Sequence, residues 1–161
     1  MEKRPKNTGF GLLEVVVGVS IIAGSIFALF AVVNGAFQMA RENVRNTQAA
    51  FLAEEGFEAL RVLRDSSWDG NIAVLSDGTP YELEFSGGEW RAVSGPALID
   101  GIFERKFVLE GVGRDSGGNI VLSGGTPDQN TKKVIVSVSW RTRNATTTKI
   151  MATYLANLFG N

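Results

Sequence analysis

The stretch that decides the fold is residues 10–40, FGLLEVVVGVSIIAGSIFALFAVVNGAFQMA. Within it, the 19 residues from Val15 to Val33 carry no charge. At a rise of about 1.5 Å per residue, they would form roughly 28 Å of α-helix, which is close to the thickness of a bilayer core. The sequence therefore predicts a membrane-spanning helix near the N-terminus.

The residues on either side of this stretch indicate its orientation. Residues 1–9, MEKRPKNTG, are polar and contain three basic side chains and one acid, and only Arg41 follows soon after the apolar stretch. Basic residues favour the cytoplasmic side of a membrane. We therefore expect a single pass through the inner membrane, with a cytoplasmic N-terminus and the rest of the chain outside.

Three interpretations of this segment compete. A cleaved secretory signal peptide needs an apolar region of about 7–15 residues and an A-x-A-like site, but the run is longer and residues 23–40 offer no good site. A plain signal anchor that holds an outer domain agrees with the composition. The third interpretation depends on Glu14, for which neither of the first two has a use.

Glu14 is an acid within the apolar segment. A charged side chain at the centre of a bilayer costs about 2.5–3.5 kcal/mol, and less near the edge, so it should have a cationic or strongly donating partner. The segment contains no Lys or Arg. Cleavage between Gly9 and Phe10 would create an α-amino group four residues before Glu14, and its pKa of about 7.7–8.0 would leave it largely charged at neutral pH. In a helical assembly, Glu14 of one chain would then neutralise the amine of its neighbour.

Residues 8–14, TGFGLLE, resemble the cleavage and methylation motif of type IV prepilins and type II secretion pseudopilins. Members of that family have a short basic leader, a Gly-Phe junction, and Glu at the fifth position of the mature chain. Residues 50–68, AFLAEEGFEALRVLRDSSW, also resemble minor pilins of the modification type. Three departures are Gly11 in place of a small polar residue, no proline in residues 10–79, and no cysteine.

The resemblance implies cleavage after Gly9 by a prepilin peptidase and N-methylation of Phe10 by the same enzyme, with Glu14 setting the register of assembly. The implied partners are this peptidase/N-methyltransferase, other pilin or pseudopilin subunits, an inner-membrane assembly platform and membrane lipid. The implied role is a structural subunit of a type IV pilus or type II secretion-like filament. Small residues allow membrane helices to approach closely, and the candidate packing positions are Gly18, Gly24 and Ala28.

The helical pattern continues through residues 41–65, which are rich in Ala, Leu, Glu and Arg. Apolar or small residues recur at three- and four-residue spacing, and charged residues lie opposite. The small and apolar positions are Ala49, Ala53, Gly56, Phe57, Leu60 and Leu63. Turn chemistry follows at residues 66–71 (SSWDGN). We thus expect a leader at 1–9, a membrane or filament-core helix at 10–40, its amphipathic continuation at 41–67, and a β-rich head at 68–161.

Strands are expected at residues 80–85, 89–93, 102–109, 133–140 and 148–155, where apolar and polar residues alternate. In the first strand Tyr81, Leu83 and Phe85 would share the apolar face, and Gly87-Gly88 would form a hairpin turn. Residues 111–131 read as a polar, Gly-rich loop. The predicted fold class is α+β, with a long N-terminal helix packed against a C-terminal antiparallel sheet.

The composition argues against catalysis. The 161 residues include neither Cys nor His, which excludes disulfides, thiolate nucleophiles and imidazole metal ligands. Lys and Arg number 16 against 17 acids, so no electrostatic signature indicates a nucleic-acid site. Asp115, Asn119 and Asp128 are potential Ca²⁺ ligands without the spacing of a calcium loop. We expect no cofactor, no metal and no enzymatic activity. A non-polymerising, membrane-anchored binding domain remains the alternative function.

Overall fold

A computed structural model describes residues 11–95, 98–121, 123–142 and 145–160. The chain divides into two compact units, Met1–Val44 and Arg45–Asn161. We refer to residues 12–44 as the apolar helix segment and to the described part of residues 45–161 as the head, and we describe each by itself.

Helix α1 (Leu12–Ser66) begins in the apolar helix segment and ends in the head. Its end is fixed by Ser67, whose extended backbone interrupts the helix and whose hydroxyl accepts a hydrogen bond from the Gly70 amide at 3.0 Å. Ser67 thereby caps a second, one-turn helix, α2 (Trp68–Asn71), where the sequence indicated only a turn. Asn71 secures the junction, because its side-chain amide donates to the Leu63 carbonyl at 3.0 Å.

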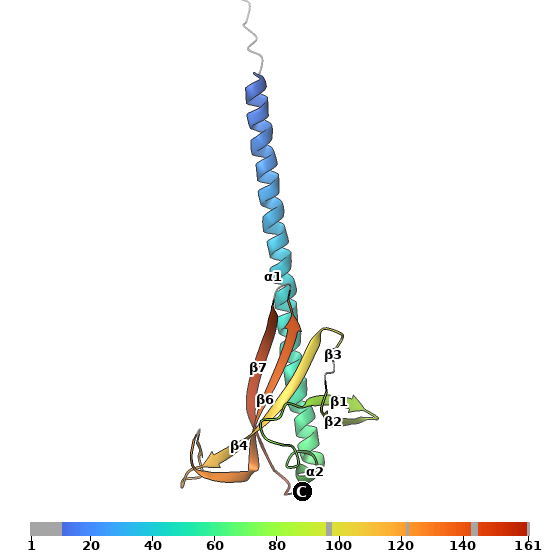
Figure 1. The fold of residues 1–161 in the computed structure, drawn as a ribbon, viewed down its shortest axis with the longest axis vertical. Helices are drawn as coiled ribbons and strands as arrows, with labels where there is room; N and C mark the ends of the chain where they lie inside the picture. Colours follow the sequence, from blue (N-terminus) through green and yellow to red (C-terminus); the bar gives the residue numbers. More distant parts are fainter. Residues whose placement is uncertain (1–10, 96–97, 122, 143–144, 161) are drawn as a thin grey trace, which may run out of the picture. The chain divides into compact units, whose positions relative to one another are not determined.

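The main sheet is antiparallel, with the order β3-β4-β6-β7 and β5 paired to β4 (Figure 1). Its strands are β3 (Leu98–Ile99), β4 (Phe103–Arg114), β5 (Ile120–Val121), β6 (Thr126–Arg141) and β7 (Thr146–Ala156). Two residues with positive φ, Asp100 and Gly101, form the tight turn from β3 to β4. The expected antiparallel sheet is therefore confirmed.

The core of the head lies between one face of this sheet and the second half of α1. Val134, Val136, Val138 and Trp140 alternate on the buried face of β6, as the sequence predicted. The helix contributes Ala49, Ala53, Gly56, Ala59, Leu60 and Leu63. Gly56 permits the close approach, since a Cβ at this position would lie 3.3 Å from both Arg105 Cδ and Val136 Cγ1. The α+β class is thus correct.

The prediction of a loop over residues 111–131 is largely wrong. Strand β4 continues to Arg114 and β6 begins at Thr126, and their pairing extends to Arg114↔Thr126 with a register shift between Gly111 and Val112. Glycines and a proline hide this pairing from a pattern of alternation, because the pairing depends on a partner strand that is distant in sequence. Gly113 is required here: a Cβ would lie 2.4 Å from the Gly124 carbonyl oxygen.

Strands β1 (Glu82–Ser86) and β2 (Glu89–Val93) form a separate two-stranded sheet around the predicted Gly87-Gly88 turn. The predicted apolar face of β1 is only partly correct. Leu83 is buried, but Glu82 is also buried and Phe85 is exposed. Alternation fails because the hairpin forms a sheet of its own that projects away from the main sheet (Figure 1). Only the start of β1 is buried, while Trp90 and Ala92 of β2 pack partly buried against the core.

Candidate functional site

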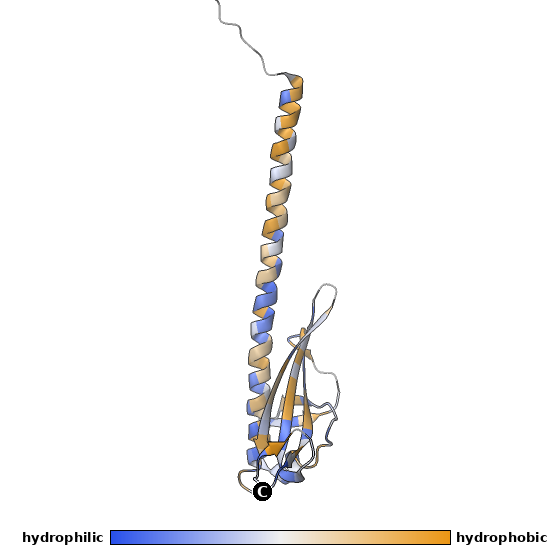
Figure 2. Ribbon diagram, turned by 90° about the vertical axis from the view of Figure 1, so that its left-hand side faces the viewer, coloured by the Kyte–Doolittle hydropathy of each residue, from blue (hydrophilic) through white to orange (hydrophobic). Residues whose placement is uncertain are grey.

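The most unusual surface of the molecule is the apolar helix segment. Its large apolar side chains are exposed around the whole circumference of the helix, and its most apolar 18-residue window has no buried residue. Figure 2 shows the hydrophobic colour around the first half of α1, where polar colours interrupt it at few places. The exposed residues in question are Leu12, Leu13, Val15, Val16, Val17, Val19, Ile21, Ile22, Ile26, Phe27, Leu29, Phe30, Val32, Val33, Phe37, Met39 and Val44.

A helix that is apolar all round needs a covering of lipid or protein. Among the described residues, α1 is the one helix that is long and apolar enough to cross a membrane. In a membrane-spanning helix the backbone N–H and C=O groups form hydrogen bonds with one another. The hydroxyls of the segment's two serines also form hydrogen bonds within the helix. Ser20 Oγ donates to the Val16 carbonyl at 2.7 Å, and Ser25 Oγ donates to the Ile21 carbonyl at 2.8 Å.

Glu14 lies in the first turn of α1 and is exposed. The Glu14 amide donates to the Gly11 carbonyl at 2.9 Å, so the residue belongs to the first turn of the helix. Within residues 11–44, which the structure describes, the first basic residue after Glu14 is Arg41. The helix N-terminus provides partial positive charge near the carboxylate. No full positive charge on the described part of the segment is close enough to neutralise it.

The small residues of the segment have open space beside them. A Cβ added to Gly18 or Gly24 would meet no other atom within 4 Å, and Ala28 is exposed. Gly24 and Ala28 are four residues apart and therefore share one face of the helix. Gly56 in the head differs, because its own chain fills the space around it. If small residues are required at positions 18 and 24, the requirement must come from a neighbouring molecule.

The head contains a buried cation that the sequence analysis did not identify. The Arg105 side chain is 4% exposed, and its Nη1 donates to the Leu52 carbonyl at 3.0 Å and to Glu55 Oε2 at 2.9 Å. The guanidinium also lies 5.5 Å from the centre of the Trp90 ring. The alternation of β4 could have indicated that Arg105 is buried, because Phe103, Arg105 and Phe107 share the inward face of the strand. Arg105 joins the helix to the sheet and the β1–β2 hairpin.

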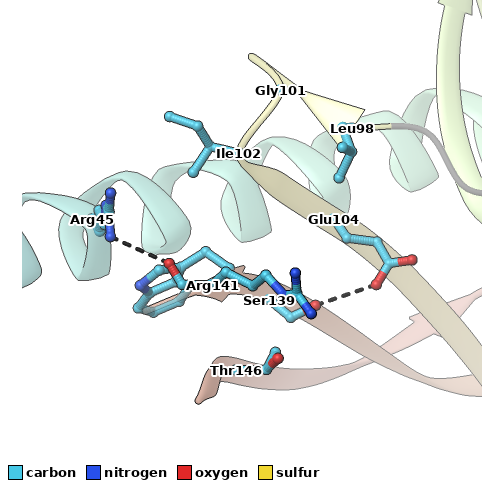
Figure 3. A pocket seen from close by; sticks show the side chains of 9 residues that line it. Arg45, Leu98, Gly101, Ile102, Glu104, Ser139, Arg141 and Thr146 are labelled. Carbon is cyan, nitrogen blue, oxygen red and sulfur yellow. Dashed lines mark hydrogen bonds between the residues drawn. The ribbon is translucent and has the colours of Figure 1, made fainter. Parts of the chain in front are cut away.

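A shallow hollow of about 460 Å³ lies at the end of the head where β6 finishes and β7 begins (Figure 3). Arg45 donates to the Arg141 carbonyl across it at 3.3 Å, and Ser139 donates to Glu104 at 3.4 Å. Glu104 also pairs with Lys106. Arg45, Ser139 and Glu104, which line the hollow, are thus held by contacts within the head.

The potential calcium ligands are used in other ways. Asp115 accepts hydrogen bonds from the amides of Gly117 and Asn119, and its pKa is lowered chiefly by the Asn119 side chain. Asp128 faces Arg114 at 2.6 Å, which lowers its pKa to about 2, with help from Thr131 and the Asn130 amide. Among the residues that the structure describes, no group of three His, Cys, Asp or Glu side chains could hold a metal ion.

The structure places Glu14, Gly18, Gly24 and Ala28 on the same exposed helix, whereas Gly9 and Phe10 lie outside the described residues. No protein-family model, curated protein sequence or solved structure matches the chain.

Proposed function

We propose that the chain is a membrane-anchored filament subunit, a minor pilin or pseudopilin of a type IV pilus or type II secretion-like system. It would be cleaved after Gly9 and N-methylated on Phe10 by a prepilin peptidase. It would wait in the inner membrane with a cytoplasmic N-terminus and an extracytoplasmic head. An assembly platform would then move it into a filament with other subunits.

The observation that carries this proposal is an acid in a helix segment whose described residues provide no positive charge to neutralise it. The segment is exposed and apolar all round, and Glu14 has no cation near it among the described residues. A plain anchor gains nothing from such a residue and bears its desolvation cost. In a bundle of staggered helices, a newly formed amine at Phe10 of one subunit would pair with Glu14 of the next.

The open sides of Gly18 and Gly24 support the same role. Removal of an apolar helix from lipid costs little only when protein re-covers it, and close helix packing provides that cover. A Cβ added at position 24 would meet no atom within 4 Å beyond the neighbouring backbone of its own helix. We therefore expect Gly24→Leu to reduce incorporation into filaments while the melting temperature of the head stays unchanged.

The proposal is tested by replacing Glu14 in the native host. We expect Glu14→Ala to be cleaved normally but to enter filaments poorly, as measured by immunoblotting of sheared surface fractions. Ser20→Ala is the matched control, because it also removes a polar group from the segment, but that group bonds only within its own helix. Normal incorporation of Glu14→Ala would refute the pairing of Glu14 with a neighbouring amine.

A membrane-anchored binding domain that never polymerises is the second candidate, and the hollow beside Arg45 is the observation that favours it. The two candidates differ in their response to Gly9→Leu. If the chain is a filament subunit, this variant remains unprocessed and the function is lost. If the chain is a plain anchor, the function survives.

A further inference from the structure

Strand β7 has an open edge. It stands at the end of the main sheet, pairs with β6 along its whole length, and has no described strand on its other side (Figure 1). Its 11 residues follow one register with β6 without interruption. Such an edge presents a row of backbone donors and acceptors to which another strand can bind.

Two hydrogen bonds determine which residues face this open edge. At one end of the β6–β7 pair the Thr142 amide donates to the Ala145 carbonyl at 2.8 Å, and at the other end the Asn157 amide donates to the Asn130 carbonyl at 2.8 Å. In an antiparallel ladder the bonded residues alternate along each strand. The odd-numbered residues of β7 therefore bond to β6. The backbone groups that point to the open edge belong to Thr146, Thr148, Ile150, Ala152, Tyr154 and Ala156.

The usual protections of a strand edge are almost absent from β7. Natural edges are short, bulged, or carry Pro and several charges. Strand β7 is long and regular, contains no Pro or Gly, and has one charge, Lys149. Ile150 and Tyr154 are exposed on its outer side. The composition favours pairing with another extended chain.

We propose that this edge accepts an extended segment of a different subunit in the same assembly, which adds an antiparallel strand beside β7 and places an Asp or Glu opposite Lys149. The inference rests on the filament role proposed above. An extended backbone is the one ligand whose donors and acceptors repeat at the two-residue spacing of the edge. The charge of Lys149 identifies the side chain that this strand should carry.

The charge argument favours a different subunit over a second copy. The Lys149 ammonium bonds to a neutral partner, Asn46 Oδ1, at 3.2 Å, and it forms no ion pair with any residue of the described head. A β7 strand from another copy contains no acid and cannot neutralise it. Opposite charges stabilise directly facing positions in an antiparallel pair.

Hydrogen exchange of residues 146–156 tests the proposal. The full chain purified alone in detergent is compared with the full chain in assembled material from its host, and exchange is read at single residues by mass spectrometry. In the isolated chain, the amides of the even-numbered residues should exchange rapidly and those of the odd-numbered residues slowly. In assembled material, the even-numbered amides should also become slow.

A pair of variants at one position isolates the edge amide. Ala152→Pro removes an amide that bonds to nothing in β6, and proline is tolerated at such positions of edge strands. Ala152→Val keeps the amide and is the matched control. We expect both variants to be processed at Gly9 and to melt near the wild-type temperature, whereas Ala152→Pro alone should enter the assembly roughly tenfold less.

Each outcome decides a separate point. Rapid exchange of the edge amides in processed, assembled wild-type material would overturn the edge proposal and leave the filament role intact. Slow exchange in the isolated chain, together with a dimer in detergent, would identify a second copy as the occupant and would also overturn it. An unprocessed wild-type chain without assembly would overturn both proposals.

Discussion

Substitution of Gly56 tests whether the two halves of α1 have different roles. A Cβ at position 56 would lie 3.3 Å from Arg105 Cδ and Val136 Cγ1 and 3.7 Å from Leu83 Cδ1. None of these neighbours can move freely, because Arg105 is held by Leu52 and Glu55 and Val136 is central in the sheet. The three further carbons of Gly56→Leu therefore enter occupied space.

The magnitude follows from two opposing effects. Overpacking of a core costs about 1–3 kcal/mol, and displacement of the buried Arg105 from its partners would add to that cost. Leu is a better helix former than Gly by about 0.8 kcal/mol. The net loss should be about 2 kcal/mol, which lowers the melting temperature of a domain of somewhat over 100 residues by roughly 8 °C.

The assay is thermal unfolding of the full chain in detergent, followed by tryptophan fluorescence. All three tryptophans, Trp68, Trp90 and Trp140, lie in the head, so the signal reports on the head alone. Gly24→Leu is the control, because nothing lies within 4 Å of its added Cβ. A Gly56→Leu head that melts at or above the wild-type temperature, or a Gly24→Leu head that melts well below it, would refute the reasoning.

Two further predictions concern the head. Phe107 is fully buried against Tyr81, so Phe107→Ala should cost about 3–5 kcal/mol of unfolding free energy, measured by urea titration, and a loss below 1 kcal/mol would contradict the described core. The pKa of Asp128 is lowered to about 2 in the folded head, from an ordinary value of 3.8. Its stabilising contribution should therefore be complete above about pH 4 and disappear as the pH falls toward 2. Asp128→Asn should flatten the pH dependence of the melting temperature in this window, and an unchanged dependence would show that Arg114 does not act through this carboxylate.

The sequence predicted the elements whose periodicity was unbroken. Val134, Val136 and Val138 alternate within one strand, and Ala49 and Leu60 follow the helical period, so each pattern indicated its buried face correctly. These elements establish the α+β fold class.

Two errors occur where structure depends on contacts distant in sequence, and a third is local. The extension of β4 through Gly113 is stabilised by pairing with β6, and no local pattern indicates that pairing. Glu82 is buried because the β1–β2 hairpin leaves the plane of the main sheet. Ser67 lies in the segment predicted as a turn, but its side chain caps the one-turn helix α2.

The candidate site was more accessible to sequence reasoning than the fold of the head. Glu14, Gly24 and Ala28 lie on one continuous helix, so their exposure follows from local sequence. The open edge of β7 could not be predicted, because an edge is defined by which strands are absent beside it.

Mass spectrometry of the N-terminal peptide, from protein made in its own host, tests the central claim most directly. The account predicts a chain that begins at Phe10 and carries one added methyl group. An intact terminus at Met1, in a host whose prepilin peptidase is active, would contradict it.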